Sequence, residues 1–403
     1  MTHHSHTNAA IYIHGCGFHS AMGQQHESIH QCLTSGVNPV MMTAGTVLNN
    51  GRSTVVGRVT EVLPQITHAN PHYHTRNNQL AWSALQPLLP LIERAKQRYG
   101  AERIAVVVGS STSGIADGEV AFTQYLKNDE FPEGYHYYRQ ELANLNDFVA
   151  DIFGVSGPSY TVSTACSSSG RVYLSARNLL RAGLADAVIV GGCDTLCQLT
   201  LNGFNGLEAL SSELCRPFEA LRSGINIGEA AAFTLLSLER DDSDTPLQLL
   251  GAGDSSDAHH ISAPEPEGKG ALEAMQKALA DAGLTPADVG YINAHGTATA
   301  LNDAMESKAI ARLFGNRVPV SSTKPLTGHT LGAASATEAA ICWHLLQYQL
   351  PLPKQALSGE IGADIADIQL VTDSCPLAKP VILSNSFAFG GNNISLIFGY
   401  PND

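Results

Sequence analysis

A cysteine and two histidines stand at points of the chain where an apolar run gives way to a serine-rich or glycine-rich turn. Cys166 lies in TACSSSG, after an apolar, β-branched run and before a segment, 172–180, whose apolar residues recur at helical spacing. This pattern predicts a buried strand, a sharp turn and a helix, with Cys166 at the helix N-terminus. Unpaired backbone N–H groups and the helix dipole there favour thiolate over thiol, so Cys166 is a candidate nucleophile. From this stretch alone, a small buried core residue is an equal alternative.

The two histidines occupy comparable positions in the second part of the chain. His295, in AHGTAT, follows an apolar run at 290–293 and precedes a helix expected to begin near Asn302. His329, in KPLTGHTLGAAS, follows a short apolar run at 318–321. A single histidine is more often structural than catalytic. One cysteine and two histidines at strand ends of matching parts of a chain, however, indicate a common active site.

The order of apolar runs and helical segments repeats along the chain, which predicts two similar α/β halves. The strand, Cys166 and helix of the first half are matched by the run at 318–321, His329 and the helix that follows. Further matching runs lie at 185–191 and 381–383, and at 232–238 and 394–398. The charged segment RDDSDTP, at 240–246, separates the halves. We therefore predict an N-terminal half, 1–244, that carries the cysteine, and a C-terminal half, 245–403, that carries the histidines.

Composition restricts the class of protein. The 403 residues are 44% apolar or aromatic and carry a formal charge of −14, which argues against broad binding to nucleic acid or to an anionic membrane. A local basic patch could still dock an acidic partner. The eight cysteines are dispersed without a CxxC pair, which favours reduced thiols in the cytoplasm. The sequence contains neither a signal-peptide pattern nor an apolar run as long as a membrane helix, so we expect neither feature.

Four motifs, TACSSSG, AHGTAT, KPLTGHTLGAAS and NSFAFGGNN, resemble in order and spacing the signature segments of the elongating β-ketoacyl-acyl-carrier-protein synthases of the thiolase superfamily. The loop CRPFEALRSGINIGEA also resembles that family, and the likeness covers the chain after its first strand. The resemblance implies a thiolase-like α/β fold in which two pseudo-duplicated halves form layers in the order αβαβα. It also implies a homodimer, or a heterodimer with a cysteine-less subunit like a chain length factor.

The resemblance implies a role for each motif. Cys166 would accept an acyl group from acyl carrier protein, with the backbone N–H groups of Cys166 and Phe389 as the oxyanion hole. His295 and His329 would stabilise the enolate formed when malonyl-carrier protein loses carbon dioxide. No metal or redox cofactor is needed for this chemistry. Lys324 would orient His329, and Glu338 would be the ion-pair partner of Lys324. Phe389 would also gate the acyl pocket.

The chain departs from the family pattern close to these motifs. Ala388, Ala298 and Ser335 stand where the family has glycine, and Glu219 replaces an aspartate. None of these positions supplies a nucleophile or donor side chain. The departures indicate a divergent branch, and they favour a specialised pathway of the polyketide or aryl-polyene type over housekeeping fatty acid synthesis.

Other functions of related proteins fit parts of the sequence less well. Degradative thiolases place a second cysteine in the C-terminal glycine-rich turn, where this chain has Phe387 and Phe389. Initiating synthases have asparagine in place of His329. A non-catalytic chain-length partner of a heterodimeric ketosynthase would lack the nucleophile, which this chain keeps. A cysteine acyl hydrolase stays an alternative, distinguished by whether water or a carbon acid takes the acyl group.

Overall fold

Continuous apolar runs form the central strands of one large mixed sheet. The computed structural model describes residues 9–43, 45–240 and 246–400. β4 (Ile104–Gly109), β6 (Ala187–Asp194) and β8 (Ala230–Ser237) are buried along their whole length. Strands covered on both faces carry apolar residues without alternation, as these do.

Within the described residues, eleven strands form the main sheet in the order β12-β11-β10-β13-β14-β9-β1-β8-β6-β4-β5, and β2, β3 and β7 form a small second sheet. The remaining strands are β1 (Tyr12–Ser20), β2 (Gly45–Val47), β3 (Ser53–Gly57), β5 (Ser159–Val162), β7 (Ile227–Gly228), β9 (Gln248–Ser256), β10 (Tyr291–Asn293), β11 (Pro319–Ser321), β12 (Gln369–Leu370), β13 (Val381–Phe387) and β14 (Asn392–Gly399). The α-helices are α1 (His26–Ser35), α2 (Pro39–Thr43), α3 (Arg76–Leu85), α4 (Leu89–Tyr99), α5 (Ile115–Asn128), α6 (Ala143–Phe153), α7 (Ser168–Arg181), α8 (Gln198–Gly206), α9 (Lys269–Ala282), α10 (Ala300–Phe314), α11 (Lys324–Thr327) and α12 (Ala334–Gln347). Short 3-10 turns are η1 (Pro71–Tyr73), η2 (Gln86–Leu88), η3 (Ala101–Arg103), η4 (Tyr137–Gln140), η5 (Pro286–Asp288) and η6 (Leu331–Ala333).

The sheet contains the same strand pattern twice. In β1-β8-β6-β4-β5 the first two pairings are antiparallel and the next two are parallel. The series β9-β14-β13-β10-β11 has the same sequence of pairings. The two series meet where Tyr12 of β1 pairs with Gln248 of β9. The thiolase-like α/β fold with a repeated half is therefore confirmed. The predicted boundary at 244/245 falls outside the described residues, and the division into two domains stays a prediction.

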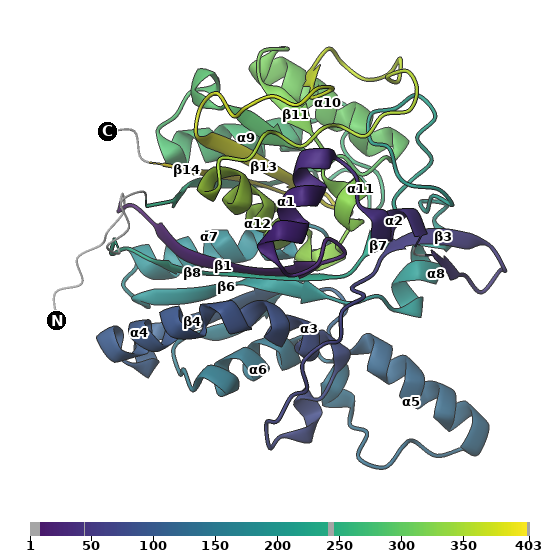
Figure 1. Cartoon of the computed structure of the whole chain (residues 1–403), viewed down its shortest axis with the longest axis vertical. Helices are drawn as coiled ribbons and strands as arrows, with labels where there is room; N and C mark the ends of the chain where they lie inside the picture. Colours follow the sequence, from purple (N-terminus) through teal and green to yellow (C-terminus); the bar gives the residue numbers. More distant parts are fainter. Residues whose placement is uncertain (1–8, 44, 241–245, 401–403) are drawn as a thin grey trace.

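Helices cover both faces of each half of the sheet. Figure 1 shows α7 and α12 in the middle of the molecule, with β4, β6 and β8 on one side of them and β13 and β14 on the other. The outer layers are α3, α4 and α6 on the first side and α9 and α10 on the second. This is the expected αβαβα order, and the central helices are the two that begin next to Cys166 and His329. None of the helices in the described part of the chain is both long and apolar enough to cross a membrane.

Close packing of β4 against α7 fixes the position of the cysteine loop. A Cβ atom added to Gly109, the last residue of β4, would lie 2.5 Å from the backbone nitrogen of Ser169 in the first turn of α7. Glycine at this position therefore lets the helix approach the strand more closely than any other residue would allow.

We expect Gly109→Ala to destabilise the protein by about 1–3 kcal/mol, because α7 must move away from β4 to make room for the methyl group. Gly203→Ala is the matched control, since Gly203 lies in α8 with no atom within 4 Å of an added Cβ. The control should stabilise the protein by up to about 1 kcal/mol through helix propensity. Denaturant unfolding measures both changes, and equal stability of the two variants would contradict this account.

Candidate active site

A sharp turn between β5 and α7 presents Cys166. Ala165 adopts a left-handed φ of 53°, which costs energy for a residue with a side chain and reverses the chain direction before the cysteine. The turn is held by Ser168, whose Oγ accepts a hydrogen bond from the Thr164 backbone N–H (2.8 Å) and donates one to the Ala165 carbonyl (2.5 Å). Cys166 is consequently held rigidly just before α7, as the sequence predicted, with only 6% of its surface exposed.

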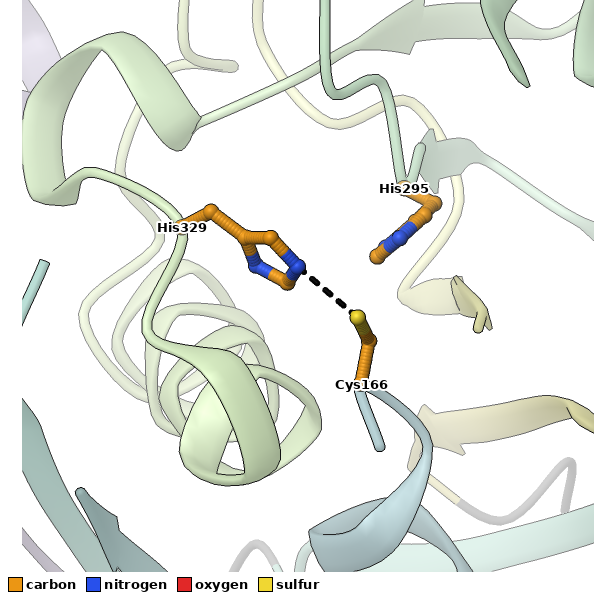
Figure 2. Close-up of side chains that lie close together, drawn as sticks. All are labelled: Cys166, His295 and His329. Atoms are coloured by element: carbon orange, nitrogen blue, oxygen red, sulfur yellow. Dashed lines mark hydrogen bonds between the residues drawn. The ribbon is translucent and has the colours of Figure 1, made fainter. Parts of the chain in front are cut away.

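His329 faces Cys166 from the other half of the molecule. Its backbone is fixed on both sides, because its N–H donates to the Asn226 carbonyl (2.6 Å) and its carbonyl accepts from the Gly228 N–H (2.9 Å). The Nε2 atom of His329 lies 2.9 Å from Sγ of Cys166. Figure 2 shows this contact as a dashed line.

His295 completes the cluster from the loop that follows β10. Glu306 of α10 is fully buried and accepts hydrogen bonds from the backbone N–H groups of His295 (2.8 Å) and Gly296 (2.7 Å), so that it fixes the loop. The two imidazoles are nearly perpendicular, with ring centroids 5.3 Å apart. In Figure 2 both rings point toward the cysteine. The structure therefore brings together the three side chains that the sequence analysis selected.

Burial determines the charge of these three groups. Desolvation first, and the nearby Lys324 charge second, lower the pKa of both histidines well below the usual range, so the rings are neutral. Burial raises the pKa of the Cys166 thiol to about 11, although Lys324 and the backbone N–H groups of Phe389 and Cys166 act in the opposite direction. The expectation of a favoured thiolate was therefore wrong, because desolvation outweighs the N-terminal position on the helix. The resting cluster is a thiol beside two neutral imidazoles.

Lys324 and Glu338 form a buried ion pair beside the cluster. The ammonium nitrogen lies 2.5 Å from Glu338 Oε1 and donates a hydrogen bond to the carbonyl of His295 (2.5 Å). The other carboxylate oxygen of Glu338 accepts from Ser386 Oγ (3.1 Å). The sequence analysis assigned Lys324 to orienting His329, whereas its ammonium instead contacts the backbone of His295. The lysine thus supplies positive charge to the site and holds the His295 loop.

Phe389 closes the space above Cys166. The cavity there has a volume of only about 10 Å³, and Phe389 and Phe204 are among the residues that line it. The two phenylalanine rings contact one another at a centroid distance of 5.9 Å. In the turn that follows, Gly390 and Gly391 have left-handed φ values of 84° and 76° and thus require glycine. Ala388 has no such φ, so alanine is accommodated there without backbone strain.

Three buried carboxylates to which the sequence analysis assigned no role hold the loops of the site. Asp194 accepts hydrogen bonds from the backbone N–H groups of Ser111 (2.8 Å), Thr112 (2.7 Å) and Ala333 (2.9 Å), which links loops of the two halves. Glu306 accepts from the backbone N–H groups of His295 and Gly296, and Asp303 accepts from that of Thr297. The available signal for Asp194 was an acidic residue three positions after the apolar run at 185–191. For Asp303 and Glu306 it was acidic residues in the first turns of a helix after AHGTAT.

The same three catalytic candidates are also the donor set best suited to a metal ion. One nitrogen of each histidine and Sγ of Cys166 lie within 4.8 Å of one another, and no other such group is found in the part of the chain that the structure describes. Sulfur and imidazole are ligands that zinc prefers. The acyl transfer that the sequence resemblance implies requires no metal. That the protein works without a cofactor remains a prediction.

Comparison with known families places the chain in a defined class of condensing enzyme. The profile of the β-ketoacyl synthase N-terminal domain matches residues 8–242, and that of the C-terminal domain matches residues 248–357. The chain therefore belongs to the β-ketoacyl synthase family, and it is an acyltransferase-type condensing enzyme with the thiolase fold. The resemblance inferred from the four motifs is thus confirmed.

Particular relatives illustrate the range of the family. The chain is 33% identical over 317 residues to 3-oxoacyl-[acyl-carrier-protein] synthase 2 of Staphylococcus aureus. This match covers 74% of this chain and 77% of the relative. It is 38% identical over 255 residues to nodulation protein E of Rhizobium meliloti, and this match covers 61% of this chain and 62% of the relative. A chain in the structure of the ketosynthase ApeO in complex with its chain length factor ApeC, from Xenorhabdus doucetiae, is 47% identical over the full length of both chains, with a TM-score of 0.92.

The raised pKa of Cys166 predicts how its reactivity depends on pH. Because only the thiolate attacks an alkylating reagent, the rate of iodoacetamide modification should increase about tenfold per pH unit from about pH 7 to about pH 9.5. Mass spectrometry of the modified peptide measures the rate at Cys166 alone. Free cysteine, which ionises near pH 8.5, is the control and should level off within this range. A plateau for Cys166 below about pH 9 would show that its thiol is more acidic than its burial implies.

Proposed function

We propose that this chain condenses an acyl group held on Cys166 with a malonyl group, both delivered as thioesters of an acyl carrier protein. The observation that carries the proposal is the 2.9 Å contact between Sγ of Cys166 and Nε2 of His329, next to a second neutral imidazole. A thiol with a neutral base beside it can attack a thioester. Two neutral imidazoles can also donate hydrogen bonds to an enolate oxygen.

In the first step, Sγ of Cys166 bonds to the acyl carbonyl carbon and the carbon–sulfur bond to the carrier breaks. His329 Nε2 is placed to accept the thiol proton and pass it to the departing carrier thiol. The oxyanion would be stabilised by the backbone N–H groups of Cys166 and Phe389. Their effect in lowering the pKa of the thiol supports this assignment, because it requires both groups to lie close to Sγ.

In the second step, the malonyl thioester loses carbon dioxide and the electrons of the broken carbon–carbon bond form an enolate. Once Sγ carries the acyl group, His329 in the neutral tautomer that is protonated at Nε2 can donate this N–H to the enolate oxygen, and the neutral ring of His295 can donate a second one. The enolate carbon then attacks the acyl carbonyl, a carbon–carbon bond forms, and the Cys166 thiolate leaves and takes up a proton. The product is a β-ketoacyl group on the carrier, two carbons longer than the primer.

The lining of the site supports delivery of substrate on a flexible arm. Thr297, Thr299 and Asn302 place polar side chains on the path to Cys166, where they can bind the amide groups of a carrier's prosthetic arm. The cavity at Cys166 is too small for an acyl chain, so Phe389 must move away from Phe204 before a primer can bind. This closed arrangement supports the role of Phe389 as the gate.

The comparisons also bear on the biosynthetic pathway in which this chain acts. The relative at 47% identity comes from a structure of a ketosynthase with its chain length factor, whereas identity to the Staphylococcus aureus synthase is 33%. We therefore place this chain in a specialised branch of the polyketide or aryl-polyene type. The chain itself supplies the catalytic subunit, because it keeps Cys166, His295 and His329, which a non-catalytic chain-length partner would not need.

Substitutions should separate the two chemical steps. Cys166→Ala should abolish the acyl adduct, because Cys166 is the one thiol among the described residues that line the small cavity of the active site. His295→Ala should leave acylation within about tenfold of wild type and reduce condensation by about a hundredfold or more, because a positioned donor contributes about 10²–10³ to such a step. Intact mass spectrometry measures the adduct after incubation with acyl-carrier proteins, and product analysis after addition of malonyl-carrier protein measures the condensation.

The controls distinguish a synthase from a hydrolase. Cleavage of the adduct without malonyl-carrier protein would favour the cysteine acyl hydrolase instead. Full condensation by the Cys166→Ala protein would contradict the mechanism outright. His329→Ala should impair both steps, because His329 contacts the thiol directly, whereas equal behaviour of the two histidine variants in acylation would remove that distinction.

The edge of the sheet supports dimer formation. Within the described part of the chain β5 pairs only with β4, and it is the last strand of the sheet. The carbonyl of Pro158 accepts from the N–H of Val106 in β4 (2.9 Å), and that of Val162 accepts from the N–H of Ser110, directly after β4 (3.4 Å). Because backbone groups alternate along a strand, those of Ser159 and Thr161 face away from β4. An edge of this kind can pair with a second chain. We propose a dimer through β5, as a homodimer or with a subunit like a chain length factor.

Native mass spectrometry tests this assembly. Ser159→Pro should convert a dimer into a species of the 42.6 kDa chain mass, because proline removes an outward N–H and leaves the pairing with β4 intact. Ser159→Ala is the matched control, since it loses the same hydrogen bond from Asn146 but keeps the N–H. A wild-type chain that is monomeric alone and dimeric with a cysteine-less partner would identify the heterodimer. Dimers of the Ser159→Pro chain would exclude β5 as the contact.

A further inference from the structure

The three side chains that the reaction uses also form a set of ligands for a soft metal ion. Sγ of Cys166 and one ring nitrogen each of His295 and His329 lie within 4.8 Å of one another, and Sγ is 2.9 Å from Nε2 of His329. The ligand atoms of a tetrahedral zinc ion lie about 3.3–3.6 Å apart, because its bonds are about 2.3 Å to sulfur and about 2.0–2.1 Å to nitrogen. Small rotations of the three side chains would therefore place all three atoms around one ion.

The space next to these atoms fits an ion and one further ligand. The cavity that Cys166 and the two histidines line has a volume of about 10 Å³, which is close to what one water molecule needs. An open zinc site has three protein ligands and one water molecule. An acyl chain requires Phe389 to move first, whereas an ion with one water molecule fits the cavity as it stands. The closed form of the site is therefore the form that suits the ion.

The types of the three ligands determine which ions the site would take. Thiolate sulfur and imidazole nitrogen favour zinc and similar transition metals, whereas magnesium and calcium prefer oxygen ligands. None of the described residues that line the cavity carries a carboxylate. Zinc is thus the ion expected here, and magnesium and calcium are not.

Two features of the surroundings limit how tightly zinc would be held. A histidine that binds a metal usually donates its second ring N–H to an acceptor, and loss of such a partner lowers the affinity by about 10–100-fold. The Nδ1 atom of His329 is buried and has no hydrogen-bond partner among the described residues. The nearby ammonium of Lys324 also repels a cation, although Glu338 partly neutralises it. Zinc would therefore be a reversible ligand and not a permanent part of the protein.

From these observations we propose that Cys166, His295 and His329 bind zinc reversibly, and that bound zinc inhibits the protein by occupying its nucleophile. Binding breaks the S–H bond of Cys166, forms a bond between zinc and Sγ and releases the proton to the solvent, with no change of oxidation state. The inhibition, though not the binding, rests on the proposed function. Because the thiolate is the metal ligand and an acylated Sγ is not a thiolate, zinc should block acylation and largely spare the condensation that follows.

Protection of Cys166 from alkylation tests the binding without any acyl carrier. In the wild-type protein, saturating zinc chloride should slow iodoacetamide modification of Cys166 by about tenfold or more, because zinc occupies the sulfur that attacks the reagent. EDTA should restore the original rate, and magnesium chloride at the same concentration should leave it unchanged. Peptide mass spectrometry separates Cys166 from Cys375, which is partly exposed and is the internal control. Zinc bound by the histidines near the N-terminus, at 3, 4 and 6, would not shield Cys166.

A variant tests whether the histidines take part. His295→Ala removes one of the three ligands and leaves the thiol in place, so half-maximal protection should need about tenfold more zinc or more, as the loss of a ligand's own partner already costs this much. His259→Ala is the matched control, because His259 is an exposed histidine outside the cluster, and it should behave as wild type. Unchanged protection in His295→Ala, equal protection by magnesium, or no protection of wild-type Cys166 would each overturn the inference.

The order of addition tests the inhibition. Zinc added before octanoyl-carrier protein should prevent the acyl adduct at Cys166. Zinc added to the octanoylated protein should leave condensation with malonyl-carrier protein within about threefold of the zinc-free rate. Equal loss in both orders would contradict inhibition through the free nucleophile. If no carrier acylates the wild-type protein, the proposed function fails, while protection from alkylation still decides whether the three residues bind zinc.

Discussion

The burial of one ion pair, Lys324 with Glu338, is the constraint on which the chemistry of the site depends. Separating an ammonium from its carboxylate in such a place would cost several kcal/mol, so the two must be formed and packed together. The ammonium also binds the carbonyl of His295 and, after desolvation, is the second cause that lowers the pKa of His295 and His329. This buried charge therefore fixes one loop of the site, and it adds to the desolvation that is the main cause of the lowered pKa of the two imidazoles. Neutral rings are what a site needs in order to donate to an enolate without protonating it outright.

This arrangement requires the two halves to meet closely, and buried carboxylates provide the connection. Asp194 lies at the end of β6 in the first half and accepts from Ala333 at the start of α12 in the second. His329 is held by backbone–backbone hydrogen bonds to Asn226 and Gly228, which belong to the first half. Each histidine thus depends on backbone hydrogen bonds to distant segments. The catalytic geometry is a property of the interface between halves and not of either half alone.

Much of the fold and the three catalytic candidates could be predicted from the sequence because their signals are local. Apolar runs predict central strands, and the cysteine and histidines each follow such a run. The ionisation of Cys166 could not be predicted, because it depends on how deeply the thiol is buried. The contact of Lys324 with the His295 carbonyl was also missed, since it joins residues 29 positions apart in sequence. Long-range contacts of this kind depend on how the elements pack, which no local pattern encodes.

The positions where this chain departs from the family pattern surround the catalytic side chains without replacing them. Ser335 places a hydroxyl 3.5 Å from the carbonyl of Cys166, and Ala298 is fully buried with a left-handed φ of 64°. Glu219 accepts hydrogen bonds from the backbone and hydroxyl of Ser358, both at 2.9 Å. Changes at such positions can alter the shape of the acyl pocket and the loops around it while the three reacting groups keep their contacts. Divergence of this kind suits a change of substrate with retention of the reaction, which is the combination that the proposed specialised pathway requires.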